Sequence, residues 1–251
     1  MSEGVFRFKR FDVRNEKSSM KVNTDAVILG AAVGMQARDG FSVLDVGTGT
    51  GVIALMLAQR LSERVSRFRV EGVDLDNASA AEAALNFSAS PWAENLFSFN
   101  EDFRGRPGVY DMIVSNPPFF EDSQVNPDSR RRLARHTGKC SGGLSCRTLL
   151  DFAAERLSCG GRAALILPAS ACGELVEYAA DIGFRPFEIL YVRADESKAP
   201  YRAVMQFCRK EDTSLRAEQC RTSELAIRSG HGEGGYTGRY AALVKDFYLW
   251  A

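Results

Sequence analysis

The stretch that decides the fold is Phe41-Ser42-Val43-Leu44-Asp45-Val46-Gly47-Thr48-Gly49-Thr50-Gly51. Its first six residues form the apolar run of a buried strand, and residues 52–61 have apolar side chains on nearly every side, which predicts a helix covered by protein. Glycines between a strand and a helix let the backbone turn sharply and approach a ligand closely, and the helix N-terminus offers free N–H groups. This stretch therefore predicts a ligand-binding turn at the edge of a sheet, although a strand–helix turn that binds nothing would show the same glycines.

Strands and helices alternate outward from this stretch. Further strands are expected at 68–73, 96–99, 110–114 and 162–167, and helices at 78–87 and 145–157. Two β-rich runs, 187–192 and 201–208, follow and predict an antiparallel pair that closes the sheet. The pattern predicts an α/β fold of the Rossmann-like kind, with a doubly wound, mostly parallel seven-stranded sheet and an antiparallel strand at one edge.

The two ends of the chain are expected to add to this sheet. The first 22 residues predict a hairpin, with Phe6, Phe8 and Phe11 in one arm and Met20 and Val22 in the other, ahead of a helix near 26–33. A polar connector is expected at 210–220 and a last helix at 236–249. We expect residues 1–36 to pack on the cofactor pocket and 37–251 to form the catalytic domain, within a single structural domain.

Composition excludes several classes of protein. The chain has 251 residues, of which 45% are hydrophobic and 25% charged, so a packed core is expected and a disordered chain is not. No apolar run reaches the roughly 18–20 residues that span a bilayer. Six cysteines without a Cys-x-x-Cys pair or a signal-peptide pattern predict free thiols in a cytoplasmic protein, with no metal site. The 32 basic and 32 acidic residues cancel, which argues against a generic nucleic-acid binder.

The charges around the glycines favour one cofactor. The spacing is G-x-G-x-G rather than the G-x-G-x-x-G of dinucleotide folds, and Asp45 precedes it. S-adenosylmethionine has an ammonium and a sulfonium cation, whereas a dinucleotide has an anionic pyrophosphate. An aspartate at the loop attracts the two cations and repels the pyrophosphate. Asp74, at the end of the next strand, is placed to accept the ribose hydroxyls. Asp102 and Phe103 follow the third strand and are placed for the adenine, although Asp102 taken alone resembles a turn residue.

The tetrapeptide Asn116-Pro117-Pro118-Phe119 directly follows the fourth strand, at the edge where open α/β sheets bind ligands. Its prolines fix the backbone and remove two donors, which leaves the Asn116 side-chain oxygen and the Pro117 carbonyl as acceptors for one planar amine. Two such hydrogen bonds favour a pyramidal nitrogen with a localised lone pair. Phe119 can stack on the base that carries the amine. A rigid loop without chemistry is the alternative for this tetrapeptide.

These motifs resemble the class I methyltransferases that use S-adenosylmethionine on an exocyclic or amide nitrogen. Three further stretches extend the resemblance to the bacterial tRNA1(Val) adenosine-37 N6-methyltransferases over essentially the whole chain: residues 8–11 with 20–30, residues 90–94, and the tail at 225–228 and 240–249. The resemblance implies that Thr24 and Asp25 help to close the cofactor pocket. It also implies a cofactor site that contains the loop residues Gly47, Thr48, Gly49 and Gly51.

Basic residues gather in two places despite the zero net charge. Residues 130–139 carry four arginines and one lysine without a carboxylate, and the N-terminal hairpin has an excess of three positive charges. Beside the tetrapeptide, such a loop is placed to hold the phosphates of a flipped nucleotide, whereas a solvated charge run is the alternative. The predicted RNA contacts are Arg10, Lys21, Arg130, Arg131, Arg132 and Arg135.

The sequence thus predicts N6-methylation of an adenosine in tRNA, with position 37 of tRNA1(Val) implied by the resemblance and no obligate protein partner. Rival functions are a guanine-N2 rRNA methyltransferase and a protein-glutamine N-methyltransferase. Outside methyl transfer, the rivals are a nicotinamide-dependent oxidoreductase, which the loop spacing disfavours, and an RNA-binding adaptor without catalysis.

Overall fold

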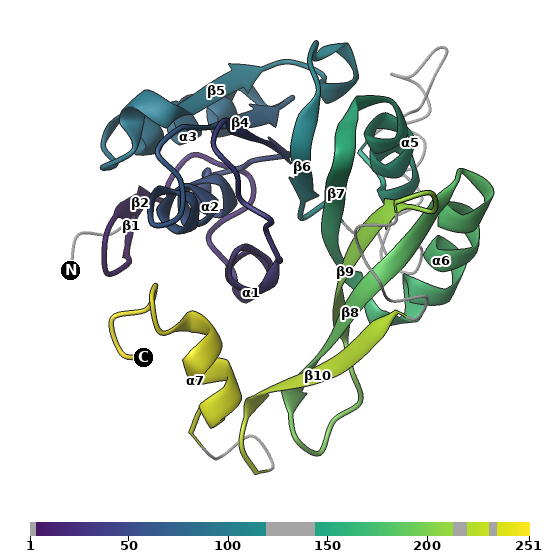
Figure 1. The fold of residues 1–251 in the computed structure, drawn as a ribbon. Helices are drawn as coiled ribbons and strands as arrows, with labels where there is room; N and C mark the ends of the chain where they lie inside the picture. Colours follow the sequence, from purple (N-terminus) through teal and green to yellow (C-terminus); the bar gives the residue numbers. More distant parts are fainter. Residues whose placement is uncertain (1–3, 119–143, 213–219, 231–234) are drawn as a thin grey trace, which may run out of the picture.

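The computed structural model describes residues 4–118, 144–212, 220–230 and 235–251. These residues form one eight-stranded sheet and a separate two-stranded hairpin (Figure 1). The hairpin consists of β1 (Val5–Arg7) and β2 (Asp12–Arg14). The strands of the large sheet are β3 (Phe41–Val46), β4 (Phe68–Asp74), β5 (Leu96–Asn100), β6 (Tyr110–Ser115), β7 (Leu157–Pro168), β8 (Phe184–Asp195), β9 (Arg202–Arg209) and β10 (Arg221–Arg228).

The sheet confirms the α/β class and corrects two details of the prediction. Its order is β10-β8-β9-β7-β6-β3-β4-β5, so it has eight strands rather than seven. The antiparallel strand β9 lies between β7 and β8 instead of at an edge, because a short turn sends the chain back from β8. β10 then pairs in parallel with the outer side of β8. It was missed because only Leu225 in β10 is buried, so the strand lacks the apolar run of the others.

Helices cover both faces of the sheet (Figure 1). One core cluster joins α1 (Thr24–Ala32), α2 (Val52–Ser62), α3 (Asn77–Ser88) and α7 (Gly238–Val244) to one face. A second cluster joins α5 (Cys146–Arg156) and α6 (Cys172–Asp181) to the other face. The helix α6 was not predicted, whereas α2, with nine buried residues, confirms the helix expected to be covered by protein.

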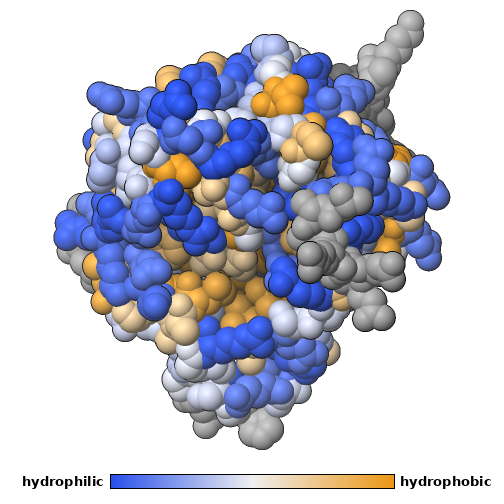
Figure 2. Space-filling model, in the orientation of Figure 1, coloured by the Kyte–Doolittle hydropathy of each residue, from blue (hydrophilic) through white to orange (hydrophobic). Residues whose placement is uncertain are grey.

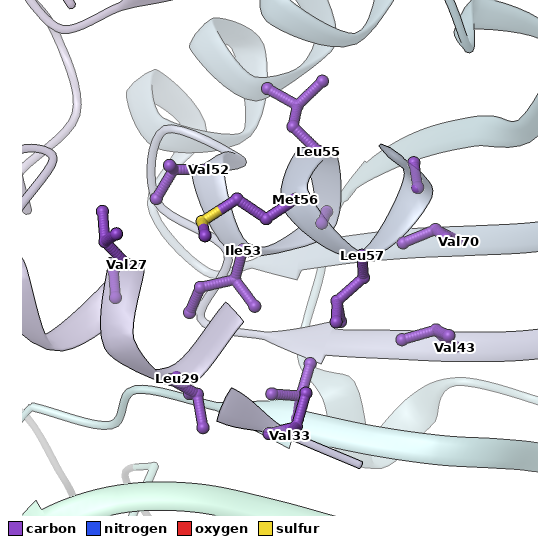
Figure 3. Packing of buried hydrophobic residues seen from close by; sticks show 14 of the residues in the cluster. Val27, Leu29, Val33, Val43, Val52, Ile53, Leu55, Met56, Leu57 and Val70 are labelled. Carbon is purple, nitrogen blue, oxygen red and sulfur yellow. The ribbon is translucent and has the colours of Figure 1, made fainter. Parts of the chain in front are cut away.

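The packing of α1 on α2 fixes the layer beneath the glycine loop. Side chains of α2, such as Ile53 and Met56, point toward α1 and lie above the strands β3 and β4 (Figure 3). A Cβ on Gly30 of α1 would stand 2.8 Å from the Met56 sulfur, so a larger residue there would require the Met56 side chain to move. The face of the molecule that is turned to the viewer in Figure 1 is mostly hydrophilic, and it has a hollow with hydrophobic residues near α1 (Figure 2).

The two ends of the chain lie together, and each is shorter than its prediction. The hairpin ends at Arg14, so Met20 and Val22 belong instead to an irregular segment, residues 15–22, which we call the strap. The last helix covers only Gly238–Val244. Phe8 forms a β-bridge with Tyr248, and the Lys9 N–H donates to the Phe247 carbonyl at 2.8 Å.

Two features are absent from the described residues. None of their helices is long and apolar enough to cross a membrane. The same residues contain no group of three or more His, Cys, Asp or Glu side chains that could hold a metal ion.

Candidate active site

A cavity of about 350 Å³ lies where β3, β4, β5 and β6 end. Its wall combines apolar side chains, three carboxylates, two strap residues and the start of the proline tetrapeptide. The lining residues are Ser19, Met20, Val46, Gly47, Gly49, Val73, Asp74, Leu75, Asp76, Glu101, Phe103, Asn116, Pro118 and Leu144. The prediction of a ligand site at this edge of the sheet therefore coincides with a real cavity.

Two of the three loop glycines face this cavity. Gly47 and Gly49 have φ values of +69° and +57°, which residues with a Cβ rarely adopt. A Cβ on Gly47 would stand 2.9 Å from Leu144 across the cavity, and one on Gly49 would stand 3.4 Å from the Ser18 hydroxyl. Gly51 instead faces α3, where a Cβ would meet the Phe87 ring at 2.4 Å. Its role is the packing of α2 on α3 rather than cavity lining.

Asp45 lies beneath the glycine loop and not in the cavity wall. The side chain is fully buried, and its Oδ2 accepts a hydrogen bond from the Thr48 hydroxyl at 2.7 Å. Its Oδ1 is buried without a hydrogen-bond partner among the described residues. Burial raises the pKa of Asp45 to about 7, and the nearby charge of Asp74 adds to this effect. The Thr48 side chain likewise lies outside the cavity wall, against Gly72 of β4.

Asp74 ends β4 and presents its carboxylate to the cavity. Its Oδ2 accepts the Gly49 N–H and its Oδ1 the Asp76 N–H, each at 2.9 Å. These bonds fix the carboxylate while leaving lone pairs on both oxygens, since each carboxylate oxygen can accept twice. Burial raises the pKa of Asp74, and the two backbone N–H groups oppose that shift. The predicted ribose acceptor is thus held in place at the cavity.

The residues after β5 differ in position from their prediction. Phe103 lines the cavity and meets Phe152 edge to face, with the ring centroids 5.3 Å apart. Asp102 lies outside the lining and caps the turn that follows it, where it forms an ion pair with Arg104. Its neighbour Glu101 lines the cavity and accepts from Arg106 at 2.7 Å. Sequence reasoning missed Glu101, because adjacent acidic residues give no signal of which one faces inward.

The tetrapeptide brings Asn116 and Pro118 to the cavity wall. Asn116 is buried, and its Nδ2 donates to the Met20 sulfur at 3.5 Å. With Nδ2 bonded to Met20, the other polar atom of the amide is the acceptor oxygen Oδ1. Pro117, the next residue, is buried as well, whereas Phe119 lies outside the described residues. Met20 had been assigned to the hairpin, so its contact with Asn116 was not foreseen.

Of the remaining predicted residues, those in the described part of the chain lie outside the cavity wall. Thr24 is exposed at the start of α1, and Asp25 forms an ion pair with Arg202 of β9 at 2.8 Å. Lys21 is exposed on the strap, next to the cavity-lining Met20. Arg10 pairs with Glu63, which caps the far end of α2, so it belongs to the opposite edge of the sheet. The arginines Arg130, Arg131, Arg132 and Arg135 lie outside the described residues.

The donor set of the cavity suits a nucleoside that carries positive charge. In the cavity wall, Leu75 and Phe103 offer apolar surface. The same wall contains three carboxylates and two glycines of the loop. Beneath the loop, Asp45 adds a buried oxygen that has no hydrogen-bond partner in the described part of the chain. Such a cradle accepts hydroxyl donors and cations and repels the phosphates of a dinucleotide.

Comparisons with known proteins agree with this geometry. The methyltransferase small domain family matches residues 20–143. A solved structure described as a predicted O-methyltransferase from Agrobacterium tumefaciens shares the fold, with a TM-score of 0.62 and 16% identity over 89% of this chain and 96% of that one. The fold and the cavity define a class I methyltransferase, whose cofactor is S-adenosylmethionine.

Two curated relatives narrow the class to one family. The tRNA1(Val) (adenine(37)-N6)-methyltransferase of Tolumonas auensis is 35% identical over 97% of this chain and 96% of its own length. The protein of the same name from Aeromonas hydrophila is 37% identical and covers 97% of each chain. The chain belongs to the tRNA1(Val) (adenine(37)-N6)-methyltransferase family.

Proposed function

We propose that the protein transfers a methyl group from S-adenosylmethionine to N6 of adenosine 37 in tRNA1(Val). The observation that carries this proposal is Asn116, which is buried at the cavity wall with its donor Nδ2 on the Met20 sulfur, so that the amide oxygen can serve as the acceptor. The name of the curated relatives supplies the substrate. The bound cofactor supplies an electrophilic methyl group, and the chain supplies the positioning of both reactants.

Asn116 and Pro117 act on the amine of the target base. Their oxygens accept hydrogen bonds from the two N–H groups of N6, which favours a pyramidal nitrogen whose lone pair points at the methyl group. Phe119 stacks on the adenine and holds it extruded from the anticodon loop. No strong base is required, because the nitrogen becomes acidic once it is methylated and releases its proton to water.

The loop and the three strand ends hold the cofactor. Asp74 accepts the ribose hydroxyls, and Phe103 lies beside the adenine. Gly47 and Gly49 let the backbone approach the amino-acid part of the cofactor. Asp45 stabilises the glycine loop from beneath, and its carboxylate favours the positive charges of the cofactor. Thr48 and Gly51 act indirectly, by fixing Asp45 and α2. We assign Asp102 to the adenine amine of the cofactor, a role that requires its ion pair with Arg104 to open on binding.

The RNA surface is proposed from charge and sequence position. Lys21, on the strap beside the cavity, and the arginines Arg130, Arg131, Arg132 and Arg135 would contact phosphates around the flipped nucleotide. Arg10 is withdrawn from this set, since Glu63 holds it at the other edge of the sheet. We place the reaction in the cytoplasm and divide the chain into an N-terminal extension, 1–36, on a catalytic unit, 37–251.

The experiment that tests the function is nucleoside mass spectrometry of unmodified tRNA1(Val) after incubation with the protein and isotope-labelled S-adenosylmethionine. We expect labelled N6-methyladenosine, which a tRNA with guanosine at position 37 should not yield. Parallel incubations with rRNA and with cell protein test the rivals: labelled N2-methylguanosine or labelled glutamine there, without label in the tRNA, would replace this proposal by one of them.

A further inference from the structure

Glu82 is a buried carboxylate in the middle of α3 that the proposed chemistry does not use. It leaves only 2% of its surface exposed, and it accepts three backbone N–H groups, all from the strap. Its Oε1 accepts from Glu16 and Lys17 and its Oε2 from Ser18, each at 2.8 Å. A carboxylate that accepts several backbone N–H groups holds the strap firmly on α3, because charge-assisted hydrogen bonds are about twice as strong as neutral ones.

Further contacts connect Ser18 of the strap with the active site. The Ser18 hydroxyl contacts both the Met20 carbonyl, at 3.0 Å, and the Ser79 hydroxyl of α3, at 3.1 Å. Met20 then carries its sulfur to Nδ2 of Asn116. Each link is a contact between named atoms, so the chain Glu82–Ser18–Met20–Asn116 connects the buried side of α3 with the amide that faces the target amine.

A second contact ties the same helix to the glycine loop. One turn after Glu82, the Asn86 side chain accepts from the Arg14 N–H at 2.8 Å and donates to the carbonyl of Thr50, also at 2.8 Å. Asn86 of α3 therefore holds the end of β2, directly before the strap, at a fixed distance from the glycine loop. Ser19 and Met20, which lie between these anchors, form part of the cavity wall.

We propose that Glu82 is a positioning residue of the methyl-transfer site: it fastens the strap so that Ser19 and Met20 complete the cavity wall and Met20 orients the Asn116 amide. The orientation matters because a rotated Asn116 would present a donor, Nδ2, to an amine that needs an acceptor. Burial tends to raise the pKa of Glu82, but the three N–H groups outweigh it and hold that pKa below the ordinary range. Glu82 is therefore ionised at neutral pH and acts as a permanent acceptor.

The claim that Met20 orients the Asn116 amide rests on the proposed function. The claim that the strap completes the wall of the cofactor cavity rests on the cavity alone. The first test compares Glu82→Gln with wild type, because glutamine keeps one oxygen but can place an NH2 group against the Ser18 N–H. We expect the Kd for S-adenosylmethionine, measured by calorimetry, to rise about tenfold, the change that loss of one hydrogen bond to a charged acceptor can produce. The kcat should fall as well, whereas the Kd for tRNA should stay within about twofold.

The matched control is Glu63→Gln, which removes the Arg10 ion pair at the other end of the N-terminal segment. It makes the same chemical change without touching the strap, so the cofactor Kd and kcat should remain those of wild type. Ser18→Ala offers a milder variant that retains the backbone N–H but loses the hydroxyl link to Met20. It should shift both constants in the same direction as Glu82→Gln, and it serves if that variant does not fold.

A double-mutant cycle separates positioning from mere stability. Met20→Leu keeps the bulk of the side chain but removes the sulfur acceptor, so kcat should fall while the cofactor Kd stays near wild type. In Glu82→Gln/Met20→Leu the loss in kcat should be smaller than the product of the single losses, because Glu82 acts through Met20. Independent losses in the cycle, or a folded Glu82→Gln with wild-type cofactor Kd and kcat, would overturn the inference. Absence of tRNA methylation by the wild-type protein, with normal cofactor binding, would instead refute the proposed function.

Discussion

The two edges of the sheet each hold a buried aspartate, and the two carboxylates have opposite surroundings. Asp45, near the carboxyl end of β3, has an oxygen without a partner among the described residues and a pKa raised to about 7 by burial. Asp111, near the amino end of the adjacent strand β6, accepts from Arg38 and the Ser158 hydroxyl at 2.7 Å each and from the Ser42 N–H at 2.9 Å. Burial also acts on Asp111, but these donors outweigh it and lower its pKa.

The cavities at the two edges show the same contrast. The amino-edge cavity, at about 680 Å³, is larger than the active-site cavity of about 350 Å³. Its charged side chains include two ion pairs, Arg38 with Asp111 and Arg162 with Asp212. In the smaller cavity Glu101 pairs with Arg106, but Asp74 is bonded to backbone N–H groups alone, and beneath the glycine loop lies the Asp45 oxygen that has no partner among the described residues. Size therefore does not distinguish the binding site, whereas unused hydrogen-bonding capacity does.

The largest effect that can test this contrast is expected from Asn116→Ala. Without its amide oxygen, the carboxyl edge loses an acceptor that acts mainly in the transition state, so methyl transfer should fall by at least about 100-fold. Cofactor binding should stay within about tenfold, because Asn116 is assigned to the substrate amine. Single-turnover methylation and calorimetry on the same preparation measure the two quantities. Near-normal turnover in this variant would remove the proposed mechanism.

A second test uses the pKa of Asp45. A cationic cofactor beside the loop favours the ionised carboxylate, so binding should release protons from the fraction of Asp45 that is protonated near pH 7. The affinity for S-adenosylmethionine should therefore rise as the pH increases from 6 to 8, by up to about tenfold per pH unit at the lower end, where most of Asp45 is protonated. Asp45→Asn should bind more weakly and lose this part of the pH dependence. An identical pH profile in wild type and variant would show that Asp45 does not sense the cofactor.

The contrast between the edges also explains which features the sequence could predict. The apolar runs that became β3 and β6 are buried on both faces, so hydrophobicity alone places their ends within one residue. β10 has one buried side chain and depends on pairing with β8, which no local pattern reveals. The position of β9 between β7 and β8 likewise follows from tertiary pairing rather than from its own residues.

The candidate site shows the same limit at the level of single residues. Charge and spacing correctly brought Gly47, Asp74 and Asn116 to one cavity, because parallel strands end at the same edge. They could not show that Asp45 points beneath the loop, since that depends on the Thr48 hydroxyl three residues later. Glu82 gave no signal in an alanine-rich helix, because its partners lie 64 to 66 residues away in the sequence.

At the amino edge the prediction concerns stability and not activity. Asp111→Asn should leave methyl transfer unchanged and lower the free energy of unfolding by about 1–3 kcal/mol, since an amide replaces a charged acceptor of several donors. A carboxyl whose pKa is lowered on folding contributes stability above its unfolded pKa, near 4, and that contribution is lost as the pH falls through the folded value. The wild-type advantage over the variant should therefore shrink below about pH 4 in urea titrations. A loss of turnover in the folded variant would mean that the amino edge takes part in catalysis.

The smallest effect is expected from Arg38→Ala, which removes the other half of the same ion pair. The Arg38 side chain is 64% exposed, so water screens its charge, and Asp111 keeps its bonds to Ser42 and Ser158 after the change. The free energy of unfolding should fall by less than about 1 kcal/mol, as for most exposed ion pairs. Urea titration of both variants gives the comparison. If Arg38→Ala cost as much as Asp111→Asn, the arginine rather than the serine and backbone donors would satisfy Asp111, and the difference between the two edges would rest on one exposed charge.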